Sequence, residues 1–184
     1  MSGQEENSFS VCYSPLDTSL LGRLWIAVRE EGLFLLDFSE TEEEFMGNLD
    51  EILKHIAGVP EIRLDPTNLS IYLEALLNFF NHKAPIPKDL PIDIDFLTDF
   101  QRQILELIQS IPFGAVMTYG DIAKQLEKEN AARAVGQVLR RNPLPIIIPC
   151  HRIVSADGTV GGYGGILGSE RKITLLKHEG VIFT

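Results

Sequence analysis

A proline-rich stretch near the middle of the chain, residues 82–91, places the strongest limit on what the chain can fold into. It contains Pro85, Pro87 and Pro91. Proline fixes φ and has no backbone N–H to donate, so no helix can run through this stretch. We interpret it as a linker and expect two domains in the 184-residue chain, over residues 1–92 and 93–184.

The first domain is expected to be an α/β unit built on a small antiparallel sheet with helices. Short apolar and β-branched runs, separated by turn residues, predict strands that form a meander. Ser39 precedes three glutamates, at 42–44, and predicts the start of a helix that ends near residue 57. The predicted strands cover residues 8–13, 22–28, 32–38 and 61–65, with turns at 14–17 and 30–32 and a second helix at 69–81.

The second domain is expected to be mostly helical. Thr98 and Gln101 match a capping box, and the helix that they begin ends at residues 112–114. Thr118 can cap a helix over 119–126, and a third helix over 131–141 stops at Asn142-Pro143. Two short helices joined by a tight turn are a helix-turn-helix pattern, which small helical domains also contain without binding DNA.

The net charge of −10 is unevenly distributed. Residues 1–92 hold 6 basic and 16 acidic residues, whereas residues 93–184 hold 10 of each. Within 131–177 a basic zone has two acids, Asp157 and Glu170, against seven basic residues: Arg133, Arg140, Arg141, Arg152, Arg171, Lys172 and Lys177. The overall charge favours solubility, and the basic zone is compatible with a modest DNA footprint.

The compartment is expected to be reducing and without a membrane. Residues 1–7 are polar and acidic, with no apolar segment of a signal peptide, and runs such as 33–36 and 146–148 are too short to span a bilayer. Two cysteines, Cys12 and Cys150, cannot build a disulfide framework. We expect a cytoplasmic protein, or a nuclear one in a eukaryote.

Cys150 is the candidate nucleophile. The apolar, proline-flanked run of residues 144–149 predicts a buried strand that presents Cys150 at its end, beside His151 and Arg152. A neighbouring imidazole or guanidinium lowers the pKa of a thiol, and the thiolate is the reactive form.

Other interpretations of Cys150 compete with this one. Free cysteines are often buried and inert. A zinc site needs further ligands, but His55, His82 and His178 follow no ligand spacing. A cysteine protease needs a remote histidine, and on an extended backbone His151 points away from Cys150. A thiol activated for one attack, with His151 acting through a water, is the interpretation that we favour.

Several motifs of the second half resemble those of the O6-alkylguanine-DNA alkyltransferase family. They occur in the family's order across residues 96–184, while the first half is similar only in length and order of elements. The motifs are Ala131-Ala132-Arg133-Ala134-Val135-Gly136, Asn142-Pro143, the run 146–154 around Pro149-Cys150-His151-Arg152, Gly161-Gly162-Tyr163-Gly164-Gly165, and 175–180 with His178-Glu179-Gly180. The resemblance implies a ribonuclease-H-like first domain and a winged-helix-like DNA-binding second domain.

The resemblance also implies the chemistry. Cys150 would take the alkyl group from oxygen 6 of guanine by in-line displacement, with oxygen 4 of alkylated thymine as a further possible substrate. The product is a thioether with no easy leaving group, so each molecule would act once. His151 would accept the thiol proton through a water, and Glu179 would hold the tautomer of His151. Asn142 would tie the recognition helix to the segment that carries Cys150.

The implied partner is duplex DNA, bound through its minor groove with the damaged base flipped out. Arg133 would enter the base stack in place of the flipped base, and the small residues around it would let the helix approach the groove. The other implied DNA contacts are Tyr119, Gly120, Ala131, Ala132, Ser155 and Ala156, and the implied alkylguanine pocket is formed by Pro145, Tyr163, Gly164 and Gly165.

No metal or other cofactor is expected, and the protein is expected to be a monomer. Some family members bind zinc in the first half, where this chain offers only Cys12, His55 and His82. Two functions from other classes remain as alternatives. One is a lesion-binding module without transfer activity, although such relatives lack the cysteine that this chain has at Cys150. The other is a regulator that senses alkylation through Cys150.

Overall fold

The computed structural model of the protein describes residues 8–182. The chain divides into two compact units, Met1–Phe96 and Leu97–Thr184. The boundary falls a few residues after the division expected at residue 92, because Asp93 pairs with the first unit. Its backbone N–H donates to the Leu33 carbonyl over 2.8 Å, and its carboxylate forms an ion pair with Arg29.

Residues 1–7, in which no signal peptide is expected, lie outside the described residues. Within residues 8–182, no helix has the length and apolar character needed to cross a membrane.

The first unit is built on a four-stranded sheet with the strand order β3-β2-β1-β4. The antiparallel pairs β1–β2 and β2–β3 confirm the predicted meander. The outer strand β4 lies parallel to β1, so the sheet is mixed, and the predicted antiparallel pairing holds for β1, β2 and β3. A helix between β3 and β4 crosses the sheet and returns the chain in the direction of β1, as a parallel pair requires. The strands are β1 (Ser8–Thr18), β2 (Gly22–Arg29), β3 (Gly32–Asp37) and β4 (Val59–Leu64).

Strand β1 continues through residues 14–17, which we expected to form a turn. Pro15 pairs with Trp25 of β2, and the pairing continues to Thr18. On the other side of β1, the strand β4 ends opposite Tyr13. Pro15 therefore lies beyond the end of β4, where its missing N–H costs no ladder hydrogen bond.

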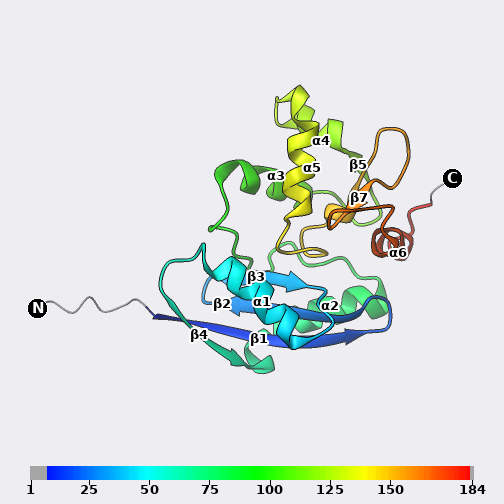
Figure 1. Ribbon diagram of the computed structural model, residues 1–184. Coiled ribbons are helices and arrows are strands. Elements are labelled where there is room, and N and C mark those ends of the chain that lie inside the picture. The colour runs from blue at the N-terminus through cyan, green and yellow to red at the C-terminus, as the bar shows by residue number, and fades with distance from the viewer. Residues whose placement is uncertain (1–7, 183–184) are drawn as a thin grey trace, which may run out of the picture. The chain divides into compact units, whose positions relative to one another are not determined.

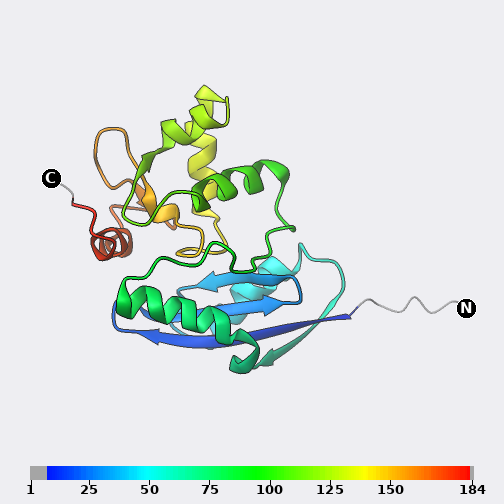
Figure 2. The ribbon, with the colours of Figure 1, turned by 180° about the vertical axis from the view of Figure 1, so that it is seen from behind.

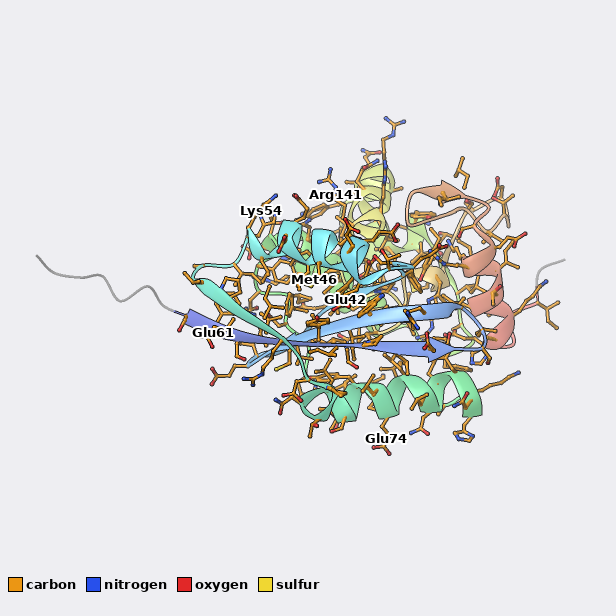
Figure 3. The ribbon with its side chains drawn as sticks, turned by 60° about the horizontal axis from the view of Figure 1, so that its bottom comes forward. Glu42, Met46, Lys54, Glu61, Glu74 and Arg141 are labelled. Carbon is orange, nitrogen blue, oxygen red and sulfur yellow. The ribbon has the colours of Figure 1, made fainter. Side chains whose placement is uncertain are left out.

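Two helices, α1 (Glu42–Leu53) and α2 (Ser70–His82), cover opposite faces of this sheet (Figures 1 and 2). A short 3-10 turn, Pro66–Leu69, leads into α2. Figure 3 shows the sheet between the two helices, with Glu74 on the outer side of α2. The core on the α1 side includes stacked rings of Trp25 and Phe45, whose centroids lie 5.2 Å apart.

Helix α1 begins two residues later than predicted. The hydroxyl of Thr41, not that of Ser39, accepts a hydrogen bond from the backbone N–H of Glu44. Ser39 donates instead to the carboxylate of Asp37. Both residue types can cap a helix, and the hydrogen bond to Asp37 commits Ser39 to the end of β3.

The second unit is mostly helical, as predicted. Both predicted caps form capping boxes, with Thr118 paired to Asp121 and Thr98 to Gln101. The strands are short pairs, β5 with β6 and β7 with β8. The elements are α3 (Asp99–Gln109), β5 (Met117–Thr118), α4 (Tyr119–Gln125), the 3-10 turn Glu129–Ala131, α5 (Ala132–Arg140), the 3-10 turn Cys150–Arg152, β6 (Ile153–Val154), β7 (Gly162–Tyr163), β8 (Ile166–Leu167) and α6 (Glu170–His178).

Residues 144–149 form a buried tight turn, so the prediction of a strand there is wrong. The N–H of Ile148 donates to the carbonyl of Leu144 over 2.8 Å, and Ile146 has φ of +76°. Pro145 and Pro149 have no N–H for a sheet ladder, which leaves the backbone free to close on itself. A β-branched residue in the left-handed region costs about 1–3 kcal/mol, which the surrounding buried side chains must offset.

Candidate active site

Cys150 is held by the side chain of Asn142. The Asn142 Nδ2 atom donates to Cys150 Sγ over 3.2 Å and to the Ile148 carbonyl over 2.9 Å. Its Oδ1 accepts from the N–H of Leu144 over 3.0 Å. One amide thus closes the turn that leads from the end of α5 to Cys150 and donates to the sulfur itself.

The sulfur of Cys150 is in a setting that favours a neutral thiol in the resting protein. Only 6% of the residue is exposed. Burial raises the pKa of the Cys150 thiol, and the hydrogen bond from Asn142 and the charge of Lys172 offset this only in part. A reaction at this sulfur therefore needs a group that takes its proton.

His151 and Glu179 form a buried pair directly behind Cys150. His151 Nε2 lies 2.8 Å from Glu179 Oε1, and His151 is fully buried. The Glu179 carboxylate also accepts hydrogen bonds from the guanidinium of Arg152, over 2.8–3.2 Å, and from the N–H of Gly114. Although burial opposes its charge, the hydrogen bonds from His151 and Arg152 lower the pKa of Glu179 to about 2.

The charge on Glu179 determines which nitrogen of His151 carries the proton. Burial lowers the pKa of His151, and Glu179 opposes this lowering. In the neutral ring, Nε2 donates to the carboxylate, so Nδ1 is the unprotonated atom. Nδ1 is buried and has no hydrogen-bond partner among the described residues. It can accept a proton, directly or through a bridging water.

A cavity of about 370 Å³ opens above the sulfur. It brings together most of the residues that the sequence singled out. Those in its lining are Cys150, Tyr119, Ala132, Arg133, Ser155, Tyr163, Gly164 and Gly165, together with Gly136, Gln137, Leu139, Arg140, Gly161, Gly162 and Leu167. Pro145, Gly120, Ala131 and Ala156 are not in the lining. Pro145 is buried in the turn before Cys150, and Ala156 is exposed.

Helix α5 presents a polar, cationic face to the cavity. Arg133, Gly136, Gln137 and Arg140 all line it, and their spacing places them on one side of the helix. In the described part of the chain, neither arginine forms an ion pair with a carboxylate. Figure 1 shows α5, in yellow, near β7, which begins the opposite wall.

The opposite wall is the loop of residues 161–165, called the cavity loop below, and its glycines permit close packing. A Cβ on Gly161, which has φ of +72°, would lie 2.9 Å from Ser155 Oγ and 3.4 Å from the Tyr119 hydroxyl oxygen. A Cβ on Gly165, which has φ of +86°, would lie 2.8 Å from Arg140 Nε. At both positions a glycine therefore lets the loop approach its neighbours.

Two buried cations, Arg152 and Lys172, make contacts at the site that the sequence did not predict. Arg152 donates to Glu179 and to the Ile111 carbonyl, and Lys172 is fully buried below the cavity loop. Neither belongs to an exposed basic zone, so that zone is smaller than predicted. The spacing of Lys172 with Leu175, Leu176 and Glu179 is that of one helix face, a signal that could have placed it inside.

No group of three or more His, Cys, Asp or Glu side chains in residues 8–182 is arranged to hold a metal ion. Both cysteines are free.

Comparison with known proteins places this site in context. Residues 99–181 match the family model described as 6-O-methylguanine DNA methyltransferase, DNA binding domain. The chain is 36% identical over 163 residues to a methylated-DNA–protein-cysteine methyltransferase of Shigella flexneri, covering 88% of this chain and 92% of that one. It is 34% identical over 180 residues to the protein of the same name from Rattus norvegicus, covering 92% and 82%.

Solved structures give the same result for the fold. The O6-methylguanine methyltransferase of Mycobacterium tuberculosis has a TM-score of 0.71 and 32% identity, with 92% of each chain covered. A structure of M. tuberculosis OGT in complex with DNA has a TM-score of 0.70 at the same identity, covering 91% of this chain and 92% of that one.

Proposed function

This chain belongs to the methylated-DNA–protein-cysteine methyltransferase family, and on that premise we propose that it is a single-use repair protein in which Cys150 keeps the alkyl group. As a member it is a DNA-repair methyltransferase with DNA as its partner. The observation that supports the proposed roles is the position of Cys150 in the cavity lining, with the buried pair of His151 and Glu179 next to it.

The proposed transfer accounts for every bond and proton with the Cys150 thiol, His151, water and the alkylated guanine alone. The Cys150 sulfur forms a bond to the alkyl carbon while the bond from that carbon to guanine oxygen 6 breaks, and the bonding pair stays with the guanine. The thiol proton passes through a water to Nδ1 of His151, and the guanine gains a proton from solvent or from the relay. The products are an S-alkylcysteine and an unmodified guanine. A thioether offers no leaving group, so the thiol is not regenerated.

Binding of duplex DNA is proposed to occur through the minor groove, with the damaged nucleotide flipped into the cavity. The cavity of about 370 Å³ is within the size range of sites that enclose a small ligand. Arg133 is exposed at the start of α5 and lines the cavity, which suits a side chain that enters the base stack. Tyr119, Ala132 and Ser155 line the same cavity, while Gly120, Ala131 and Ala156 are proposed DNA contacts outside it.

The protein is proposed to act as a monomer in a reducing compartment, the cytoplasm or, in a eukaryote, the nucleus. Two free, buried cysteines fit such a setting.

Intact-protein mass spectrometry after incubation with a duplex that contains O6-methylguanine tests the proposal. We expect one added methyl group, located on the peptide with Cys150, and no further addition when fresh duplex is supplied. Cys12→Ser should react in the same way, and Cys150→Ser should bind the duplex without gaining mass. Repeated turnover, or transfer by Cys150→Ser, would refute it. A duplex with O4-methylthymine in the same assay determines whether thymine is a second substrate.

The same experiment separates the two alternatives. A lesion-binding module binds the methylated duplex but gains no mass. A regulator gains the methyl group and then binds one DNA sequence far more tightly than others, which a minor-groove contact is poorly suited to achieve.

A further inference from the structure

Lys172 is a buried cation that the proposed relay does not use. On α6, the residues Lys172, Leu175, Leu176 and Glu179 are spaced as one face of a helix, and all four are buried. Lys172 is the cationic residue of this face, and none of its surface is exposed. Long cationic side chains normally reach the surface, so its burial calls for a physical reason.

The ammonium of Lys172 joins two segments of the site. Its Nζ donates to the Ile153 carbonyl, just after the Cys150–Arg152 turn, and to the Gly162 carbonyl of the cavity loop over 3.1 Å. It also lies 5.9 Å from the centroid of the Tyr119 ring, another wall of the cavity. Lys172 therefore fixes the cavity loop against the segment that carries the nucleophile.

The charge of Lys172 has no ion-pair partner among the described residues. Arg152, the other buried cation, is paired with Glu179, but no carboxylate within residues 8–182 pairs with Lys172. Two carbonyl dipoles offset only part of the several kcal/mol that burial of an ammonium costs. The site therefore holds an excess of buried positive charge while the thiol of Cys150 is neutral.

We propose that Lys172 is a positioning residue of the transfer, whose buried ammonium is compensated by the Cys150 sulfur as that sulfur becomes an anion. This role rests on the proposed function of Cys150. As the thiol proton leaves, the negative charge forms at Cys150, three residues before the carbonyl of Ile153 that holds the ammonium of Lys172. The positive charge is already fixed there, so it needs no reorganisation. Glu179 does the corresponding work for His151, because it stabilises the imidazolium that receives the proton.

The electrostatics of the pair agree with this arrangement. Burial raises the pKa of Cys150 and lowers that of Lys172 to about 8, and each charge opposes the effect of burial on the other. The charged and titratable groups that face the pair contribute to the electrostatic field around it. These are Tyr119 from α4, His151 and Arg152 from the turn after Pro149, Tyr163 from β7, and Arg171 and Glu179 from α6 and its end.

The test measures the ionisation of Cys150 without DNA, so that it does not depend on repair activity. In a Cys12→Ser background, the rate of Cys150 alkylation by iodoacetamide is followed against pH. We expect Lys172→Met to move the midpoint up by about one pH unit, which slows the reaction below the midpoint about tenfold. Lys172→Arg should keep part of the effect, and the exposed Lys124→Met should leave the profile unchanged. A slower reaction with the same midpoint would mean a purely structural role and would overturn the proposal.

A second measurement needs no change at Lys172. In the Cys12→Ser protein, the ε-carbon resonance of Lys172 is titrated by NMR before and after S-methylation of Cys150 with methyl iodide. A thioether cannot become an anion, so the pKa of Lys172 should be lower in the methylated protein. An unchanged pKa would overturn the proposal. If both measurements give the expected result but the protein with native Lys172 transfers no methyl group from DNA, the proposed function is wrong and the role of Lys172 is not.

Discussion

The Nε2 atom of His151 lies 2.8 Å from Oε1 of Glu179, and both side chains are fully buried. His151 belongs to the 3-10 turn that contains Cys150, and Glu179 is the residue at which α6 ends. The contact therefore joins the turn that carries Cys150 to the end of α6, and it fixes the imidazole proton on Nε2, which leaves Nδ1 free to accept.

The stability that Glu179 contributes should be lost in acid. Its pKa is about 2 in the folded protein, and that of an unfolded glutamate is about 4.3. The contribution is fully present above about pH 4.3 and disappears as the pH falls toward about 2. By urea unfolding, we expect the destabilisation caused by Glu179→Gln to be roughly 3 kcal/mol larger at neutral pH than at the acid limit. Glu74→Gln, at an exposed acid on α2, serves as the control, and a pH-independent difference for Glu179→Gln would contradict the prediction.

Asn142→Ala should slow alkyl transfer even from a free alkylguanine, because the substitution removes the donor to Cys150 Sγ and loosens the turn before it. A hydrogen bond to a charged group contributes about 1.5–3 kcal/mol, so we expect a loss of tenfold or more in single-turnover rate. Asn68→Ala is a matched control, since the Asn68 amide donates to the other sulfur, that of Cys12. Equal rates for Asn142→Ala and Asn68→Ala would show that the contact has no role.

Arg133→Ala should impair transfer from duplex DNA far more than transfer from a free alkylguanine. A free base needs no flipping, so only the duplex reaction depends on a side chain that fills the vacated stack. Single-turnover rates with both substrates provide the measurement. The exposed Arg141 lies outside the cavity lining, and Arg141→Ala should cause at most the small loss of one phosphate contact. Equal losses on both substrates for Arg133→Ala would refute the role in flipping.

Gly165→Ala should displace Arg140 from the cavity wall. The new methyl group would lie 2.8 Å from Arg140 Nε, at a residue with φ of +86°. Gly158→Ala has a similar φ, +82°, but its methyl group would meet nothing within 4 Å. Both variants should lose about 1 kcal/mol of stability from the backbone. Only Gly165→Ala should also slow transfer severalfold, and the same rate in both variants would show that the position of Arg140 does not matter.

The features that could be predicted from the sequence are local ones. The capping boxes at Thr98 and Thr118 involve residues three apart. The helices α3 and α5 end at Gln109 and Arg140, a few residues before the breaks predicted at 112–114 and Asn142-Pro143. The meander was likewise predicted from short segments and their turns. Such signals do not depend on what the rest of the chain does.

The features that could not be predicted depend on distant partners. Pro15 is tolerated in β1 because β4 ends opposite Tyr13, far along the chain. The apolar run 144–149 fits a strand or a buried turn equally well, and only the contacts of Asn142 decide between them. At the site, the cysteine motif is legible in the sequence. Lys172 falls within the predicted basic zone, and only its spacing with Leu175, Leu176 and Glu179 indicates that it is buried.

The amide of Asn142 has a consequence for how this part of the chain can change. It forms hydrogen bonds with Leu144, Ile148 and Cys150, so the number of residues between Asn142 and Cys150 is fixed by the reach of one side chain. A single inserted or deleted residue would move the sulfur out of reach of the amide. We therefore expect that residues 142–150 can be exchanged between related proteins only as a whole segment.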